Sequence, residues 1–372
     1  MNRFVFAHAA GRDWREASRD CLAGLAATPR DANLGFVYAT DHCAEAMAEI
    51  LATAQRVTGI AHWVGTVGMG ICASGREYHD QPAVGMMLAS FPDDGFRVFG
   101  NLRQDLDAFV DVNRPWYART ASRFGIVHGD PRNARLPDLL AALGEEVNGG
   151  FFVGGLSSSR GVHAQVADGV TEGGLSGVLL APEVGVATTL TQGCAPFGAM
   201  HEITECERNI LITLDGKPAL EVFYAEIGDI LARDLNRAAH YIGAALPLPG
   251  TDTGDYLVRN LVGADTDKKL LAIGELVNPG QRIQFCRRDA PSAEQDMRRM
   301  LRELKARAAQ APRGGVYYSC VGRGPNLFGA QSEELKTIQE ELGEFPLVGF
   351  YCNGEISNNR LYGYTGVLTL FL

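Results

Sequence analysis

The stretch VYYSCVGRGPNLFG, residues 316–329, contains more than a simple turn requires. Its β-branched and aromatic start, residues 316–318, is typical of a buried strand, and it leads directly into a loop in which Arg323 stands between two glycines. A single glycine or asparagine supplies the positive φ that a turn needs. An arginine held among glycines therefore indicates a loop with a specific binding partner.

The pattern around this stretch occurs three times in the chain. Each copy has a short β run, a polar loop, an amphipathic helix, a second β run ending in Val-Gly, a glycine-rich loop and a returning strand. A strand joined through a helix to another strand is most naturally a parallel pair with a right-handed crossover. The first β runs are 36–38, 126–127 and 316–318, and the second are 62–65, 151–154 and 347–349. The sequence predicts an α/β fold of three related β-α-β units that form mixed sheets with flanking helices.

Residues 183–216 show a different pattern. Strand-forming residues stand at every second position, as in Val186, Thr188 and Leu190, and the last run ends at Asp215 and Gly216. A period of two is typical of a half-buried strand, and Asp-Gly is a common turn. We therefore predict an antiparallel insertion around 183–216.

Composition and charge exclude several classes of protein. The chain has 372 residues, 46% of them hydrophobic and 21% charged, which is typical of a globular protein. Its formal charge of -10 and the lack of a long basic run argue against nucleic acid as a partner. We find no signal-peptide core and no run of about 18 apolar residues, so we expect no membrane span and a cytoplasmic location.

Signatures of catalysis and of metal binding are missing from the sequence. There is no nucleophile elbow, phosphate loop or HExxH motif, and the eight cysteines form no CxxC pair. The eight histidines are isolated, so we expect no metal site. These observations favour a binding protein over an enzyme. A cysteine-dependent enzyme with Cys320 or Cys352 as nucleophile is an alternative, since Arg323 could lower a thiol pKa.

The loops of the third copy can supply both charges that a free amino acid requires. A pocket for an amino acid typically places a guanidinium or backbone N–H groups against the carboxylate, and a carboxylate against the ammonium. Arg323 can supply the first and Glu355 the second. Both follow predicted strands, so they should lie on one rim, outside the carboxyl ends of the strands. The alternative to a ligand-binding site is a purely structural Arg-Glu ion pair that closes this rim by itself.

The candidate ligand-binding residues all come from these two loops. They are Ser319, Cys320, Gly322, Arg323, Gly324, Asn353, Gly354 and Glu355.

Several ordered motifs resemble the FIST domain. They are GCAPFG at 193–198, NILITLDGKPALE at 209–221, DYLVRNLVG at 255–263, RRD at 287–289, SCVGRG at 319–324 with Phe328, and GFYCNGEI at 349–356 followed by YGYTGVLTL. FIST proteins carry an N-terminal and a C-terminal module. The resemblance therefore implies a FIST N-terminal domain at 30–219 and a FIST C-terminal domain at 220–372.

The resemblance implies a sensory domain of intracellular signal transduction that binds small molecules such as amino acids. Some members of the family instead bind heme, sense nitric oxide and signal to histidine kinases or cyclic-di-GMP enzymes. Many members carry a fused output domain, and we recognise none in this chain. We therefore expect a small-molecule ligand, no obligatory cofactor, and a separate signalling protein as partner.

A heme-binding nitric oxide sensor is the alternative that the family offers. The chain has no CxxCH motif, so the heme would be a non-covalent heme b with a histidine as axial ligand. His128, at the predicted carboxyl end of a strand, and His201, after the GCAPFG turn, are the best placed for this role.

Overall fold

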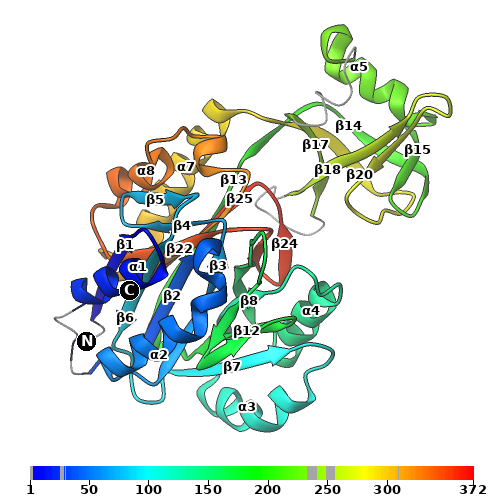
Figure 1. Ribbon diagram of the computed structural model, residues 1–372. Helices are drawn as coiled ribbons and strands as arrows, with labels where there is room; N and C mark the ends of the chain where they lie inside the picture. Colours follow the sequence, from blue (N-terminus) through cyan, green and yellow to red (C-terminus); the bar gives the residue numbers. More distant parts are fainter. Residues whose placement is uncertain (1–2, 26–28, 30, 233–240, 249–255, 309) are drawn as a thin grey trace. The chain divides into compact units, whose positions relative to one another are not determined.

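The protein is described from a computed structural model that places residues 3–25, 29, 31–232, 241–248, 256–308 and 310–372 (Figure 1). The chain forms two compact units, one made of Met1–Thr191 with Met297–Leu372 and the other of Gln192–Asp296. We call them the repeat unit and the inserted unit, because the chain leaves the first after residue 191 and returns to it at residue 297. The division into 30–219 and 220–372 expected from the motifs follows the order of the chain and stays a prediction.

The repeat unit contains the three predicted copies, each with the same order of strands and α-helices. The first is β1 (Phe4–Ala10), α1 (Trp14–Gly24), β2 (Leu34–Thr40), η1 (Asp41–Ala46), α2 (Met47–Thr58), β3 (His62–Gly68), β4 (Gly70–Ala73), β5 (Arg76–His79) and β6 (Ala83–Ala89). The second is β7 (Phe96–Leu102), α3 (Asp107–Thr120), β8 (Phe124–Gly129), α4 (Leu136–Glu146), β9 (Phe151–Leu156), β10 (Gln165–Ala167), β11 (Gly169–Thr171) and β12 (Leu175–Leu180). After η2 (Pro182–Val184), the third is β13 (Val186–Gln192), α7 (Ala290–Ala308), β21 (Gly314–Cys320), η3 (Gly324–Asn326), α8 (Glu333–Leu342), β22 (Leu347–Cys352), β23 (Glu355–Ser357), β24 (Arg360–Tyr362) and β25 (Thr365–Phe371).

Each repeat builds one six-stranded sheet, and each sheet receives its last two strands from another repeat. The strand orders are β1-β6-β2-β3-β10-β11, β7-β12-β8-β9-β23-β24 and β13-β25-β21-β22-β4-β5. The hairpin β4–β5 of repeat 1 thus extends the sheet of repeat 3, β10–β11 of repeat 2 extends that of repeat 1, and β23–β24 of repeat 3 extends that of repeat 2. This cyclic exchange joins the repeats, because each sheet is completed only by a neighbour.

The predicted parallel pairs are present in all three repeats, as β2–β3, β8–β9 and β21–β22. In each pair the glycine of the Val-Gly sequence lies against the backbone of the preceding strand. A Cβ built on Gly65, Gly154 and Gly349 would lie 1.7, 1.8 and 1.7 Å from the carbonyl oxygens of Val37, Val127 and Tyr317, respectively. The recurring Val-Gly therefore has a steric cause, since only glycine allows so close an approach of two backbones.

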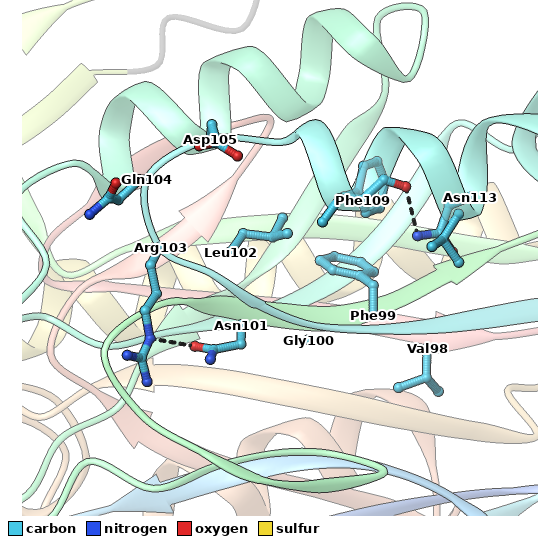
Figure 2. A pocket seen from close by; sticks show the side chains of 12 residues that line it. Val98, Phe99, Gly100, Asn101, Leu102, Arg103, Gln104, Asp105, Phe109 and Asn113 are labelled. Carbon is cyan, nitrogen blue, oxygen red and sulfur yellow. Dashed lines mark hydrogen bonds between the residues drawn. The ribbon is translucent and has the colours of Figure 1, made fainter.

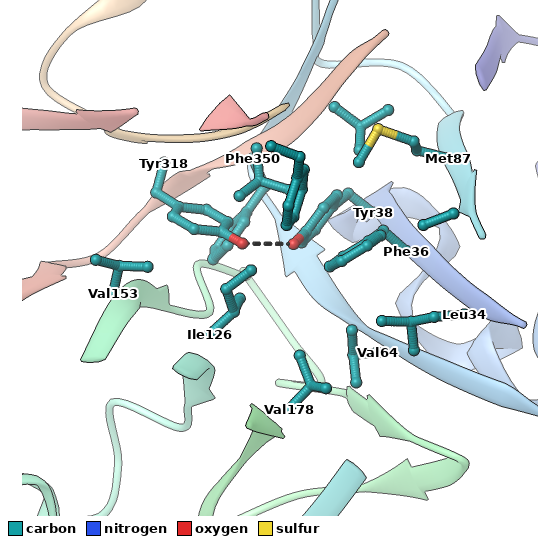
Figure 3. Packing of buried hydrophobic residues seen from close by; sticks show 14 of the residues in the cluster. Leu34, Phe36, Tyr38, Val64, Met87, Ile126, Val153, Val178, Tyr318 and Phe350 are labelled. Carbon is teal, nitrogen blue, oxygen red and sulfur yellow. Dashed lines mark hydrogen bonds between the residues drawn. The ribbon is translucent and has the colours of Figure 1, made fainter. Parts of the chain in front are cut away.

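Helices cover the outer face of each sheet, and the inner faces pack against one another. α1 and α2 share a buried cluster with the sheet of repeat 1, α3 and α4 with that of repeat 2, and α7 and α8 with that of repeat 3. The inner faces meet in one cluster with contributions from all three sheets (Figure 3). Phe36, Ile126 and Val316 are among its fully buried members. Each such side chain contributes about 1.5–3 kcal/mol to folding.

The inserted unit is a closed antiparallel sheet, which confirms the predicted antiparallel insertion and extends it beyond residue 216. Its strand order is β14-β20-β17-β18-β19-β15-β16, and β14 also pairs with β15. Its elements are β14 (Cys194–Glu207), β15 (Ile210–Leu214), β16 (Lys217–Pro218), α5 (Ala219–Ala232), β17 (Ile242–Pro247), β18 (Tyr256–Asp265), β19 (Leu270–Ile273) and β20 (Arg282–Arg288). The first run of the predicted segment, β13, instead joins the sheet of repeat 3 beside β25.

The mixed α/β architecture with three related β-α-β copies is therefore confirmed. Within the described part of the chain, no helix is both long enough and apolar enough to cross a bilayer.

Replacing Gly65 by alanine should destabilise the protein strongly, because the new methyl group would overlap the Val37 carbonyl oxygen. We expect the free energy of unfolding, measured by urea denaturation, to fall by at least about 3 kcal/mol. Gly169→Ala is the matched control, since a Cβ at Gly169 meets nothing within 4 Å, and it should change stability by less than about 0.5 kcal/mol. Equal effects of the two substitutions would contradict the close backbone approach.

Candidate functional site

The two predicted loops lie at one edge of the repeat-3 sheet. β21 and β22 run parallel, with Ser319 opposite Tyr351 and Cys320 opposite Cys352. Their carboxyl ends therefore meet at the same edge, and the loops after them begin side by side. The carboxyl end of parallel strands is the edge at which α/β proteins bind ligands.

Arg323 is fully buried and forms an ion pair with Glu334 on α8. Its Nε lies 2.7 Å from Oε1 of Glu334, and both side chains are 0% exposed. The same carboxylate accepts hydrogen bonds from the Tyr317 hydroxyl at 2.6 Å, from the Ser319 hydroxyl at 3.0 Å and from the Gly324 backbone N–H at 3.0 Å. Glu334 thus gathers donors from the end of β21 and from the glycine-rich loop. This ion pair accounts for the arginine among glycines.

The glycine that follows Arg323 is required by packing. Gly324 has a φ of +50°, and a Cβ there would lie 2.7 Å from the ring of Tyr351. The Arg323 guanidinium carbon also lies 4.9 Å from the centre of the Phe328 ring, a cation–π contact within the loop itself. The loop is therefore closed around its own arginine.

Strand alternation divides the predicted site residues between the two faces of the sheet. Consecutive residues of a strand point to opposite faces, and Ser319 points to α8, where it contacts Glu334. Cys320 points to the inner face, where the Glu355 carboxyl is close enough to affect its pKa. The structure therefore groups Ser319, Arg323 and Gly324 on the helix side, and Cys320 with Glu355 on the inner side.

The remaining predicted residues hold the turns in place. Asn353 is exposed, and its backbone N–H donates to the Leu156 carbonyl at 3.0 Å, while the Gly354 carbonyl accepts from the Leu156 N–H at 2.9 Å. Gly354 has a φ of +119°, a conformation that L residues rarely adopt. The Gly322 N–H donates to the Cys320 sulfur at 3.4 Å. The two contacts with Leu156 tie the loops of repeats 2 and 3 together.

The Glu355 carboxyl is buried with one oxygen unpartnered. The residue opens β23 and is 0% exposed. Its Oε2 accepts hydrogen bonds from the N–H and the hydroxyl of Thr365, at 3.1 and 2.8 Å, whereas Oε1 has no partner among the described residues. Burial raises the pKa of Glu355 to about 8, although the Thr365 hydrogen bonds, the charge of Arg323 and the Cys320 thiol act in the opposite direction. Strongly shifted carboxyl groups of this kind gather at functional sites.

The two rim cysteines are not activated thiols. Burial raises the pKa of Cys320 and of Cys352, and the nearby Glu355 raises both further. Since the thiolate is the nucleophile, a raised pKa lowers reactivity at neutral pH. The surroundings of these thiols therefore favour non-covalent binding over the cysteine-dependent enzyme.

Tyr38, His128 and Tyr318 meet where the three inner faces come together. Each is in the first strand of its parallel pair, opposite the residue that follows the Val-Gly glycine. The Tyr38 hydroxyl lies 2.8 Å from the Tyr318 hydroxyl, shown by the dashed line in Figure 3, and 3.1 Å from Nε2 of His128. Burial lowers the His128 pKa to about 3, so this imidazole is neutral. His128 Nδ1 has no partner in the described part of the chain.

Neither candidate histidine has surroundings that fit a heme. The His128 ring is enclosed by three aromatic rings with centroids 5.5–6.0 Å away, which leaves no space for a porphyrin. His201 uses both ring nitrogens, since Nδ1 lies 2.7 Å from Oδ2 of Asp215 and Nε2 lies 3.2 Å from Oε1 of Glu226. The geometry of both residues therefore argues against an axial ligand.

A surface hollow of about 500 Å³ lies where β7 leads into α3 (Figure 2). Phe99 and Phe109 pack edge to face in its lining with centroids 5.0 Å apart. Arg103 donates from Nε to the Asn101 side-chain oxygen and from Nη2 to the Glu172 carbonyl. Sequence reasoning missed this hollow, because its only signal is a polar run, residues 103–105, directly after a strand.

Removing the Arg323 guanidinium should destabilise the fold, because Glu334 would keep its buried charge without a cation. We expect Arg323→Ala to lower the free energy of unfolding at pH 7 by about 3–5 kcal/mol. Arg302→Ala is the control, since the Arg302 side chain is 66% exposed and its ion pair with Glu341 lies at the surface; it should cost less than about 1 kcal/mol. If Arg323→Ala lowered the free energy of unfolding as little as the control does, the buried Glu334 carboxylate would not depend on the Arg323 guanidinium.

The chain is similar to known proteins along most of its length. An uncharacterized protein of Mycobacterium tuberculosis is 32% identical to this chain over 339 residues. An uncharacterized protein of Mycobacterium bovis is 31% identical to it over 371 residues. The first alignment covers 87% of each chain, and the second covers 95% of this chain and 93% of the relative. A solved structure described as T. maritima PurL complexed with ATP aligns with 99% of this chain and 71% of its own at 11% identity, but its TM-score of 0.24 supports no argument.

The match to family descriptions is nearly continuous. Residues 33–217 match the FIST N domain, and residues 219–358 match the FIST C domain. The motifs noted in the sequence fall within these two ranges, apart from the last strand. The chain therefore belongs to the FIST family, whose domains are sensory domains of signal transduction that bind small ligands.

Proposed function

We propose that this chain senses a small amine-bearing metabolite, such as an amino acid, and that Glu355 receives its ammonium group. The observation that carries this proposal is the unpartnered Oε1 of a fully buried carboxyl. Leaving such an oxygen without a hydrogen bond costs about 1–3 kcal/mol, and more when it is charged. An ammonium supplies both the donor and the opposite charge that this oxygen lacks.

Ionisation of Glu355 controls binding in this proposal. With a pKa of about 8, the carboxyl is mostly protonated at pH 7, and a bound ammonium displaces the proton because it stabilises the carboxylate. The other titratable groups that act on Glu355 do not change over this range. The Cys320 thiol stays protonated because burial raises its pKa, and Arg323 stays charged. Affinity for a cation should therefore rise as the pH approaches 8.

The position of the Glu355 carboxyl suits a ligand that enters from the rim. Cys320, the neighbour of Glu355, is 8% exposed and directly precedes the loop of Gly322. Gly155 stands opposite Glu355 on the neighbouring strand β9. The Cys352 side chain fills the space where a side chain at Gly155 would lie. A carboxyl with thiol and apolar groups around it matches a small molecule with an ammonium and a short apolar part. The Arg323 guanidinium, paired with Glu334, is not assigned to the ligand.

The contact between Glu355 and Thr365 gives ligand binding a route to the rest of the repeat unit. Thr365 opens β25, which pairs with β21 and with β13. β13 is the strand from which the chain enters the inserted unit. A change in the charge of Glu355 alters the hydrogen bonds at the start of β25. We propose that a separate signalling protein, such as a histidine kinase or a cyclic-di-GMP enzyme, responds to that change.

A thermal-unfolding screen against amino acids, simple amines and the matching carboxylates without an amine tests this proposal. An amine-bearing ligand at a hundred times its Kd should add about 2.7 kcal/mol of stability and raise Tm by several degrees. Its Kd should improve about tenfold from pH 6 to pH 7, because the ionised fraction of Glu355 rises tenfold. Glu355→Gln should lose both the shift and its pH dependence.

The control is Glu183→Gln, the same chemical change at an exposed position, which should leave the shift intact. A shift that survives in Glu355→Gln but is lost in Arg103→Ala would place the ligand in the hollow beside α3 and would refute the role of Glu355. No response to any amine at pH 8 would refute the proposed ligand class.

A further inference from the structure

The internal repeat places three different side chains at equivalent points of the inner faces. Each lies in the first strand of an exchanged hairpin and stands opposite the residue that follows the Val-Gly glycine. These pairs are Gln165 with Thr66, Glu355 with Gly155, and Ile71 with Phe350. An amide, a carboxyl and an alkyl group thus occupy one position of the repeat. A ligand at this position would therefore meet a different chemical group in each copy.

The amide and the carboxyl are held by the backbone at equivalent positions, although the amide donates its hydrogen bond and the carboxyl accepts its own. Nε2 of Gln165 donates to the Gly174 carbonyl at 3.0 Å, and Oε2 of Glu355 accepts from the Thr365 N–H at 3.1 Å. Gly174 directly precedes the returning strand β12, and Thr365 opens the returning strand β25. In both residues Oε1 has no hydrogen-bond partner among the described residues. Gln165 is therefore the neutral counterpart of Glu355.

Two further unpartnered polar atoms follow in the strand that begins after Gly174, the hydrogen-bond partner of Gln165, and in the strand paired with it. Ser176 lies two residues after Gly174 and stands opposite His128 across β12 and β8. Within the described ranges, neither Oγ of Ser176 nor Nδ1 of His128 has a hydrogen-bond partner. Gln165, Ser176 and His128 are all 0% exposed. Buried side chains with unpartnered polar atoms are rare in native proteins, and each calls for a partner.

Repeat 3 shows that packing alone does not require these polar atoms. Its residues at the positions of Ser176 and His128 are Val367 and Tyr318, which face each other across β25 and β21. Valine needs no hydrogen-bond partner, and the Tyr318 hydroxyl is already bonded to Tyr38. The same backbone arrangement therefore exists without unsatisfied groups at these two positions. The polar atoms of repeat 2 need another explanation.

We propose that Gln165, Ser176 and His128 form a second ligand niche, which binds a small neutral molecule that both donates and accepts hydrogen bonds, such as a primary carboxamide. Oε1 of Gln165 can only accept, so the ligand must offer a donor, and the Ser176 hydroxyl can complement either group. None of the three side chains carries a charge, because His128 is neutral. An ionic ligand would therefore be buried here without compensation. This niche does not depend on the ammonium site at Glu355.

Acetamide and acetate are suitable probes, because they have nearly the same shape and differ in charge. Thermal unfolding of the full chain should show a saturable rise in Tm with acetamide and none with acetate at equal ionic strength. The acetamide response should persist in Glu355→Gln, so failure of the ammonium proposal would leave this result unchanged. A crystal soaked with acetamide should show it within hydrogen-bond distance of Gln165 Oε1.

The double variant Gln165→Ile with Ser176→Val places at the first position the isoleucine of repeat 1, Ile71, and at the second the valine of repeat 3, Val367. We expect it to lose the acetamide response and to gain several degrees in Tm without ligand, since two unpartnered polar groups are removed. Ser176→Ala is a milder second variant and should weaken acetamide binding about tenfold, which corresponds to one lost hydrogen bond. An acetamide response that persists in both variants, or a soaked crystal with only ordered water at these atoms, would overturn the proposal.

Discussion

The inner faces of the three sheets pack against one another, so every polar group on them must find a partner away from bulk water. The Tyr38 hydroxyl meets this requirement by bonding to both Tyr318 and His128. On the outer side of the third sheet, the carboxylate of Glu334 meets it by collecting donors from Arg323 and its neighbours. Glu355 and Gln165 each retain an unpartnered oxygen. The unsatisfied groups, more than the glycine-rich loops, are therefore the positions at which we propose that ligands bind.

The exchanged hairpins explain how one architecture holds different chemistries. Each hairpin places one inward-facing side chain opposite the second strand of the parallel pair of another repeat, and that side chain is Ile71, Gln165 or Glu355. The backbone at this position is fixed by strand pairing on both sides, so the side chain can vary without changing the sheet. A repeat protein can in this way keep one apolar copy for stability and two polar copies for binding.

The internal repeat could be predicted from the sequence, but the contacts within the candidate site could not. The three β-α-β copies could be predicted because each carries a Val-Gly whose glycine is needed for close backbone contact, as at Gly65. The hairpin exchange joins segments hundreds of residues apart, such as β4 and β22, and leaves no local pattern. The rim with Arg323 and Glu355 could be predicted from strand order. The partner of Arg323 could not, because Glu334 looks like an ordinary helix residue until α8 packs on the sheet.

The most direct test of this account is the free energy of unfolding of the ligand-free protein between pH 5 and pH 9, compared with that of Glu355→Gln. The unfolded chain ionises Glu355 near its ordinary pKa, whereas the folded chain keeps the proton until about pH 8. Folding is therefore favoured at low pH by this group. The wild type should lose up to about 1.4 kcal/mol per pH unit relative to the variant as the pH rises to 8. Parallel curves for the two proteins would show that the carboxyl is already solvated or paired, and would contradict the account.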